Sequence, residues 1–156
     1  QRLSGCCFCF RRAAFGELNF DTNLKRVSFM EDLDFSYRIH KTHPQSLYAV
    51  PHAKIVHKVS AKARLPTKPT IYMTTIYWFY VFFKDVFEGS IINLVAFLWA
   101  LAGNLVNTAG SLIVRKRPKH QWWELVYLIN SYFYAFRQLR KIKRGNLEFF
   151  NKQLKE

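Results

Sequence analysis

The sequence predicts an α/β region followed by an α-helical membrane-associated region, and three observations carry this fold class. Short apolar runs of β type alternate with one helical pattern within residues 1–69. Residues 90–114 contain no charged side chain. The net charge of +14 is divided as +7 over residues 1–69, −1 over residues 70–114 and +8 over residues 115–156. We therefore expect three parts with these bounds, a basic one on either side of an apolar one.

The first part contains one pattern of helical spacing between β-type runs. Phe29, Leu33 and Tyr37 recur every fourth residue, so residues 31–41 are expected to form a helix of about three turns. Its first turn is acidic, as the exposed N–H groups and the dipole of a helix start favour. Strands are expected at residues 3–10, 46–50 and 53–59, and residues 60–69, with two prolines, form the boundary.

The three cysteines, Cys6, Cys7 and Cys9, fall within four residues of one another. Two of them would face one side of a strand and one the other, and no histidine stands at a zinc-binding spacing. They are expected to be buried and reduced, which favours a cytoplasmic setting.

The middle part is a candidate membrane segment. The 25 residues from Ser90 to Val114 are long enough to cross a hydrocarbon layer of about 30 Å at about 1.5 Å per residue. A deeply inserted hairpin and a buried core helix are the alternatives. Residues 70–87 could be a second short span whose Lys84 reaches the interface, or an aromatic helix lying flat on the membrane. Two spans would return residues 115–119 to the cytoplasm and leave only acids outside.

The last part is expected to be a basic amphipathic helix. Its apolar residues follow helical spacing, and its cations crowd the end of that helix. Such a helix suits anionic headgroups; an ordinary helix packed on the domain is the alternative. The apolar positions are Trp122, Val126, Ile129, Phe133, Phe136 and Leu139, and the cations are Arg137, Arg140, Lys141, Lys143 and Arg144.

Glu31, Asp32 and Asp34 are the acids that are candidates for a catalytic role. Taken alone, they are acids of a kind common in the first turn of a helix. Proton removal from a hydroxyl needs a carboxylate that stays ionised at neutral pH, and a helix start favours the ionised form. Asp32-Leu33-Asp34 also spells a metal-binding Asp-x-Asp string, but that string normally ends a buried strand, whereas these residues begin a helix.

The segment Glu31-Asp32-Leu33-Asp34-Phe35-Ser36-Tyr37-Arg38-Ile39 resembles the acceptor-side motif of family 2 glycosyltransferases. Upstream, Gly5, the apolar run and Arg11-Arg12 look like the acceptor-site strand of that family. Downstream, Val50-Pro51-x-Ala53 followed by His57 looks like its strand ending in a histidine near the donor diphosphate. The resemblance covers residues 3–60 and is to non-processive, rhamnosyltransferase-like members, since the processive Gln-x-x-Arg-Trp signature is absent.

The resemblance implies the C-terminal half of a GT-A-type catalytic domain with a membrane-associated tail. It implies that Asp32 is the general base, with Glu31 beside it, and that Gly5, Arg11, Asp34 and His57 contact substrate. A divalent metal, Mg or Mn, is implied by the family alone, with His57 as a candidate ligand; a structural histidine at a strand end is the alternative. Arg38 is expected to pair with an acid.

The expected reaction moves a sugar, with inversion, from a nucleotide-sugar donor to a glycan or lipid-linked acceptor at the cytoplasmic face of a membrane. The chain opens on Gln1 rather than Met, and we expect it to be a fragment that needs a nucleotide-binding half. The alternative is a non-enzymatic basic membrane protein that binds anionic lipids or partner proteins. Nucleic-acid binding is not expected, because the aromatic residues fall largely in the apolar middle and the tail. The sequence does not indicate the sugar or the oligomeric state.

Overall fold

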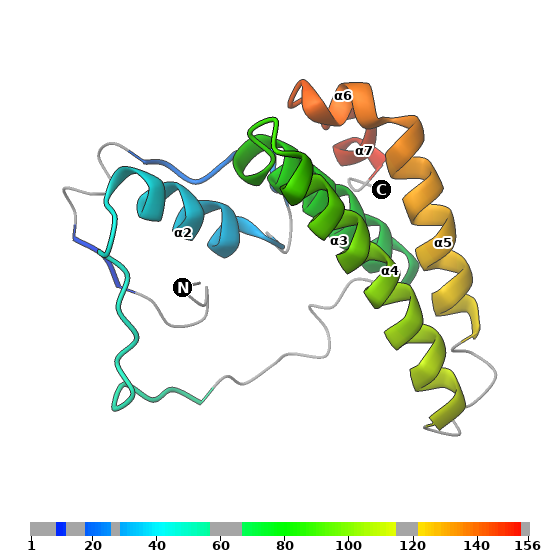
Figure 1. Cartoon of the computed structure of the whole chain (residues 1–156), viewed down its shortest axis with the longest axis horizontal. Coiled ribbons are helices and arrows are strands. Elements are labelled where there is room, and N and C mark those ends of the chain that lie inside the picture. The colour runs from blue at the N-terminus through cyan, green and yellow to red at the C-terminus, as the bar shows by residue number, and fades with distance from the viewer. Residues whose placement is uncertain (1–8, 12–17, 26–28, 57–66, 115–121, 154–156) are drawn as a thin grey trace. The chain divides into compact units, whose positions relative to one another are not determined.

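The structure is a computed structural model that describes residues 9–11, 18–25, 29–56, 67–114 and 122–153 of the 156-residue chain (Figure 1). The chain divides into two compact units, Gln1–Arg64 and Leu65–Glu156. Unit 1 contains helix α2 (Glu31–Thr42). Unit 2 contains α3 (Thr67–Val81), the π-helical turn η2 (Phe82–Val86), α4 (Ile91–Val114), α5 (Trp122–Arg137), α6 (Leu139–Lys143) and α7 (Glu148–Asn151).

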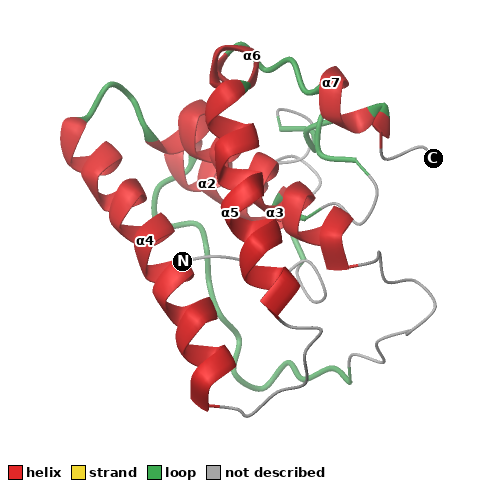
Figure 2. Ribbon diagram, turned by 90° about the vertical axis from the view of Figure 1, so that its right-hand side faces the viewer, coloured by secondary structure: helices red, strands yellow, loops and turns green. Residues whose placement is uncertain are grey.

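Every regular element among the described residues is a helix, as Figure 2 shows, so the expected α/β fold class, the C-terminal half of a GT-A-type domain, is wrong. Residues 46–50, expected as a strand, form an exposed loop in which Tyr48 is 75% and Val50 64% exposed. A short apolar run becomes a strand only when another strand pairs with it and one face is buried. Residues 9–10 and 53–56 are likewise not strands, and the rest of the other two expected strands lies outside the described residues.

Helix α2 confirms the expected helix at residues 31–41, with one residue added at its end. Phe35 and Ile39, four residues apart, are buried on one face at 1% and 5% exposure. The helix ends where the backbone N–H of His43 bonds the carbonyl of Ile39 at 2.7 Å. Pro44 follows, and Gln45 takes a left-handed conformation with φ of 61°, which turns the chain away from the helix.

The core of unit 1 forms around Phe35. Its ring stacks on Phe20 with 4.7 Å between centroids and meets Phe10 edge-on at 5.6 Å. Leu24, at 5% exposure, adds to the same small core. Helix α2 is therefore held by loop segments from both sides of residues 12–17 rather than by a sheet.

Helix α3 is the buried helix of unit 2. Its apolar residues are covered nearly all round, as expected for a helix without a polar face. Those at 5% exposure or less are Met73, Ile76, Tyr77, Phe79, Tyr80 and Val81. It packs mainly against α5, and Thr75 and Ser131 share a buried hydrogen bond of 2.8 Å between the two helices. Residues 70–87, expected as a second short span or a flat-lying helix, thus form a core helix and a π-helical turn.

The contacts fix the directions of the long helices of unit 2. Lys68 lies over Tyr127 near the start of both α3 and α5, and Phe79 meets Phe136 near the end of both, so these helices are parallel. Helix α4 runs the opposite way, because Phe97, in its first half, stacks on Phe82 just beyond the end of α3, at 4.0 Å between ring centroids. In both views α6 lies at the end of unit 2 where α4 begins (Figures 1 and 2).

The turn between η2 and α4 is built by backbone conformation and one amide. Glu88 and Gly89 both have positive φ, 42° and 77°, a region that glycine adopts without strain. Asn93 then donates from Nδ2 to the carbonyl of Val86 at 2.7 Å, so the first turn of α4 is tied to η2.

Candidate functional site

The expected catalytic acids lie at the start of α2. Met30, at the N-cap, has φ of 77° and offers no side-chain cap, so the helix begins with Glu31 and Asp32 in its first turn. Asp32 is 9% exposed, and its Oδ1 accepts a hydrogen bond of 2.8 Å from the backbone N–H of Leu33. Glu31 is half-buried.

The third acid, Asp34, has a different environment. It is fully buried at 0% exposure, and the guanidinium of Arg38 donates to its Oδ2 from Nη2 at 2.6 Å and from Nε at 3.0 Å. Arg38 also donates from Nη2 to the carbonyl of Asn19 at 2.8 Å. The expected pairing of Arg38 with an acid is confirmed. The pair connects α2 to the segment before it. Asp34 therefore helps to hold α2 in place and does not lie on the surface of the site.

Asp32 and Asp34 do not fit the implied divalent metal. An ion needs several oxygen ligands that converge on one point. Asp34 is already bound by Arg38, and residues two apart on a helix do not face each other. No group of three histidine, cysteine, aspartate or glutamate side chains that could hold a metal occurs among the described residues. We derive no step through a metal.

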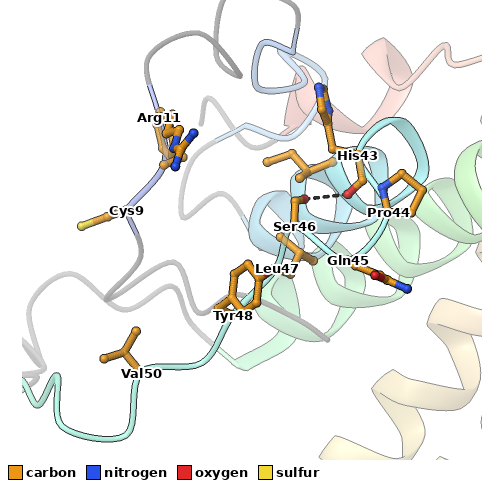
Figure 3. Close-up of a pocket in the computed structure, with 11 residues that line it drawn as sticks. Cys9, Arg11, His43, Pro44, Gln45, Ser46, Leu47, Tyr48 and Val50 are labelled. Carbon is orange, nitrogen blue, oxygen red and sulfur yellow. Dashed lines mark hydrogen bonds between the residues drawn. The ribbon is translucent and has the colours of Figure 1, made fainter.

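A cavity of about 670 Å³ lies at the other end of α2, and Figure 3 shows its lining. Arg11 lies there, together with His43, Gln45 and Tyr48. Its wall is fixed by two short contacts: Ser46 donates to the carbonyl of His43 at 2.6 Å, and the Thr42 hydroxyl lies 2.9 Å from the His43 Nδ1. Asp32 is not part of the lining. Eleven residues of helix, about 16 Å, separate Asp32 from His43, so Arg11 is not brought next to the acids that were expected to be catalytic.

Two expected site residues, Gly5 and His57, lie outside the described residues, as do Cys6 and Cys7. Cys9 is described; it is unpaired and exposed, so the expectation that it is buried is wrong. It borders the same cavity as Arg11.

Sequence reasoning did not single out a second, smaller cavity of about 200 Å³ between α3, α4 and α5. Its polar lining is Thr70, Thr74, Thr75, Asn104, Thr108 and Glu124. Beside it, Asn104 donates to the Tyr132 hydroxyl at 3.0 Å. The sequence signal that could have located this cavity is the presence of a few polar residues in three apolar helices. Buried polar groups in such helices are generally hydrogen-bonded to one another.

Helix α4 presents an exposed apolar surface. Its residues Ile91–Ile113 are long and apolar enough to cross a membrane, and 11% of that stretch is buried. The predicted apolar helix is thus confirmed, and the alternative of a buried core helix does not apply within this unit.

Comparison with protein-family models, with curated proteins and with solved structures found no match.

Proposed function

We propose that this chain is the membrane-attached part of a sugar-transferring enzyme, similar in its acceptor-side motif to family 2 glycosyltransferases, with Asp32 as general base. The observation that supports the proposal is that the acids of α2 have different environments. Arg38 holds Asp34 inside unit 1, while Glu31 and Asp32 stand together at the start of the helix. The proposal rests on this helix and its motif, not on a sheet.

In the proposed reaction, the oxygen of an acceptor hydroxyl attacks the anomeric carbon of a nucleotide sugar. The Asp32 carboxylate accepts the proton of that hydroxyl during the attack. A new C–O bond forms at that carbon, and the bond to the diphosphate oxygen breaks, its electron pair leaving with the nucleotide. Attack from the opposite face inverts the anomeric centre. Glu31 orients the hydroxyl beside Asp32. A positioned base of this kind contributes about 10²- to 10⁴-fold to a rate.

Unit 2 attaches the enzyme to a membrane, with the catalytic unit on the cytoplasmic side, where nucleotide sugars are available. The support for attachment is the uncharged helix α4, most of which the rest of unit 2 leaves uncovered. The acceptor is a glycan or a lipid-linked glycan, and a membrane-attached enzyme keeps such a lipid-linked acceptor at a high local concentration.

The test is Asp32→Asn in the polypeptide at its native length, assayed for nucleotide-sugar-dependent transfer in membranes. The variant keeps the shape of the side chain and removes its basicity, so we expect a loss of at least about 10²-fold in kcat with unchanged membrane content. The matched control is Glu148→Gln, which removes an exposed acid from unit 2. Near-normal turnover of the Asp32→Asn variant would remove the catalytic assignment.

A second candidate function is membrane binding without chemistry, through anionic lipids or partner proteins. The observation that favours it is the exposed apolar surface of unit 2, which needs no active site to explain it. It predicts that Asp32→Asn and Glu31→Gln are both silent in every functional assay while membrane binding is retained. The same pair of variants therefore separates the two functions.

A further inference from the structure

Helix α4 carries an apolar stripe along its whole length that no described residue of unit 2 covers. Ile92, Trp99, Val106 and Ile113 follow one another at intervals of seven and are 76%, 80%, 72% and 75% exposed. Residues seven apart lie on the same face of a helix, and the stripe extends about 32 Å. An uncharged stripe of this size is a surface that avoids water.

Helix α5 exposes a second stripe, and it is the stripe that the sequence predicts to be apolar. Trp122, Val126, Ile129, Phe133 and Phe136 are all at least 39% exposed. The face turned to α3 is formed instead by Leu128, Ser131, Tyr132 and Ala135, which are buried. The stripe is therefore largely uncovered by α3, apart from Phe136, whose ring meets Phe79. Helix α5 does pack against α3, as in the sequence alternative of an ordinary packed helix, but most of its predicted apolar stripe stays exposed.

Six of the cations of unit 2 gather at the end where α4 begins. Helix α6 packs against η2 and α3, and Lys143 lies over the rings of Phe83 and Phe87 at 4.6 and 5.5 Å. Lys84 in η2 lies over Tyr80 at 5.5 Å. We call this group the basic end; it comprises Lys84, Arg137, Arg140, Lys141, Lys143 and Arg144, all exposed.

The opposite end of α4 is followed by a second set of cations, Arg115, Lys116, Arg117 and Lys119. If α4 crossed a membrane, one of the two sets would lie in the outer headgroup layer, contrary to the positive-inside tendency. A hairpin of two spans, α3 and α4, does not remove the conflict. In the structure the basic end lies against η2 at the tip of such a hairpin, which would place cations beside the acids there.

We propose that unit 2 lies in the plane of one anionic leaflet, with the stripes of α4 and α5 among the acyl chains and the basic end bound to phosphate headgroups. This inference rests on the proposed membrane attachment and specifies its geometry. An anionic phospholipid leaflet fits better than an acidic protein or a nucleic acid, because the cations flank an uncharged stripe instead of lying along it. Lys84 and Lys143 lie over aromatic rings and are exposed, so their charges are available to headgroups beside an aromatic surface.

The first experiment determines on which side the two ends of α4 lie. Single-cysteine variants Glu88→Cys and His120→Cys, with Cys6, Cys7 and Cys9 replaced by serine, are expressed at native length and labelled with an impermeant maleimide in sealed inverted membrane vesicles. We expect both positions to be labelled to the same extent without detergent. Labelling of one position with detergent-dependent labelling of the other would show a span and overturn the in-plane geometry, while leaving membrane attachment intact.

The second experiment tests the headgroup contacts with purified protein and vesicles of phosphatidylcholine, with and without phosphatidylglycerol. Neutralising Arg140, Lys141 and Arg144 to glutamine should lower the partition coefficient onto the anionic vesicles about fivefold per residue, with little change on neutral vesicles. The matched control neutralises three exposed lysines of unit 1, Lys25, Lys41 and Lys54, and should change neither. Equal loss from both variants would overturn the assignment of the basic end. If the unmodified protein bound neither kind of vesicle, the proposed membrane attachment and the in-plane geometry would both be wrong.

Discussion

The Arg38 guanidinium donates two hydrogen bonds to the same oxygen of Asp34, one turn earlier on α2, from Nη2 at 2.6 Å and from Nε at 3.0 Å. The carboxylate is fully buried, while the arginine side chain keeps 20% of its surface exposed. The third bond of Arg38, to the carbonyl of Asn19, makes the pair a connection between α2 and the chain before it. Asp34 is therefore a structural support for the acids at the start of the same helix.

The first prediction concerns this pair. Arg38→Ala removes the guanidinium that binds a buried carboxylate and should lower the free energy of unfolding of unit 1 by about 3–5 kcal/mol. Denaturant unfolding followed by circular dichroism measures the loss. Because the cost comes from burying the Asp34 charge without the guanidinium, the double variant Arg38→Ala, Asp34→Asn should recover part of it.

The control for that prediction is an ion pair with the same spacing on the surface of unit 2. Lys152 and Glu148 lie 3.5 Å apart, with 77% and 76% of their side chains exposed. Lys152→Ala should change the free energy of unfolding by less than about 1 kcal/mol, because exposed pairs are screened by water. Equal losses at the two pairs would contradict the view that burial makes the Arg38 pair important.

The second prediction separates the roles of the two acids that stand at the start of α2. Glu31→Gln should reduce kcat about tenfold, less than Asp32→Asn does, because it disturbs the orientation of the hydroxyl but leaves the base in place. Steady-state kinetics of both variants in membranes gives the comparison. A larger loss of kcat in Glu31→Gln than in Asp32→Asn would assign the base to Glu31 instead.

The sequence predicted elements whose signal is local. Helix α2 follows from the spacing of Phe29, Leu33 and Tyr37 and from its acidic first turn, and α4 follows from a long uncharged run. The strand expected at residues 46–50 depended on a partner that local sequence does not specify, and it is a loop.

The orientation of α5 could not be read from its apolar spacing either. Spacing locates a stripe on one face of a helix but does not determine whether protein or another medium covers that face. The position of α6 against η2 depends on contacts between residues about 60 positions apart, such as Lys143 and Phe83, and these are not encoded in any local pattern. For the candidate site, the sequence located the acids of α2 and indicated that Arg38 pairs with an acid, whereas the identity of that acid, Asp34, and its burial came from the structure.

The third prediction concerns the attachment of α7 to α3. The Tyr77 hydroxyl donates to Asn151 Oδ1 at 2.8 Å, and both residues are buried. Asn151→Ala leaves the hydroxyl buried without this acceptor and should lower the free energy of unfolding by about 1–3 kcal/mol. Adding Tyr77→Phe to that variant should cost little more, since the partner is already gone. Additive losses in this double-mutant cycle, measured by thermal unfolding, would show that the two groups do not interact.

The fourth prediction compares two apolar residues of α4 that have opposite environments. Phe97 is 5% exposed, stacks on Phe82 and meets Phe79 edge-on at 5.1 Å, so Phe97→Ala should lower the free energy of unfolding by about 3–5 kcal/mol. Val106 is 72% exposed on the outer stripe, so Val106→Asp should leave stability within about 0.5 kcal/mol. The same change places a charge among the acyl chains and should reduce binding to anionic vesicles about tenfold or more.

Thermal unfolding and vesicle sedimentation of both variants measure the two effects separately. If Val106→Asp instead unfolded the protein and left vesicle binding unchanged, the outer stripe of α4 would be a protein contact and not a lipid contact.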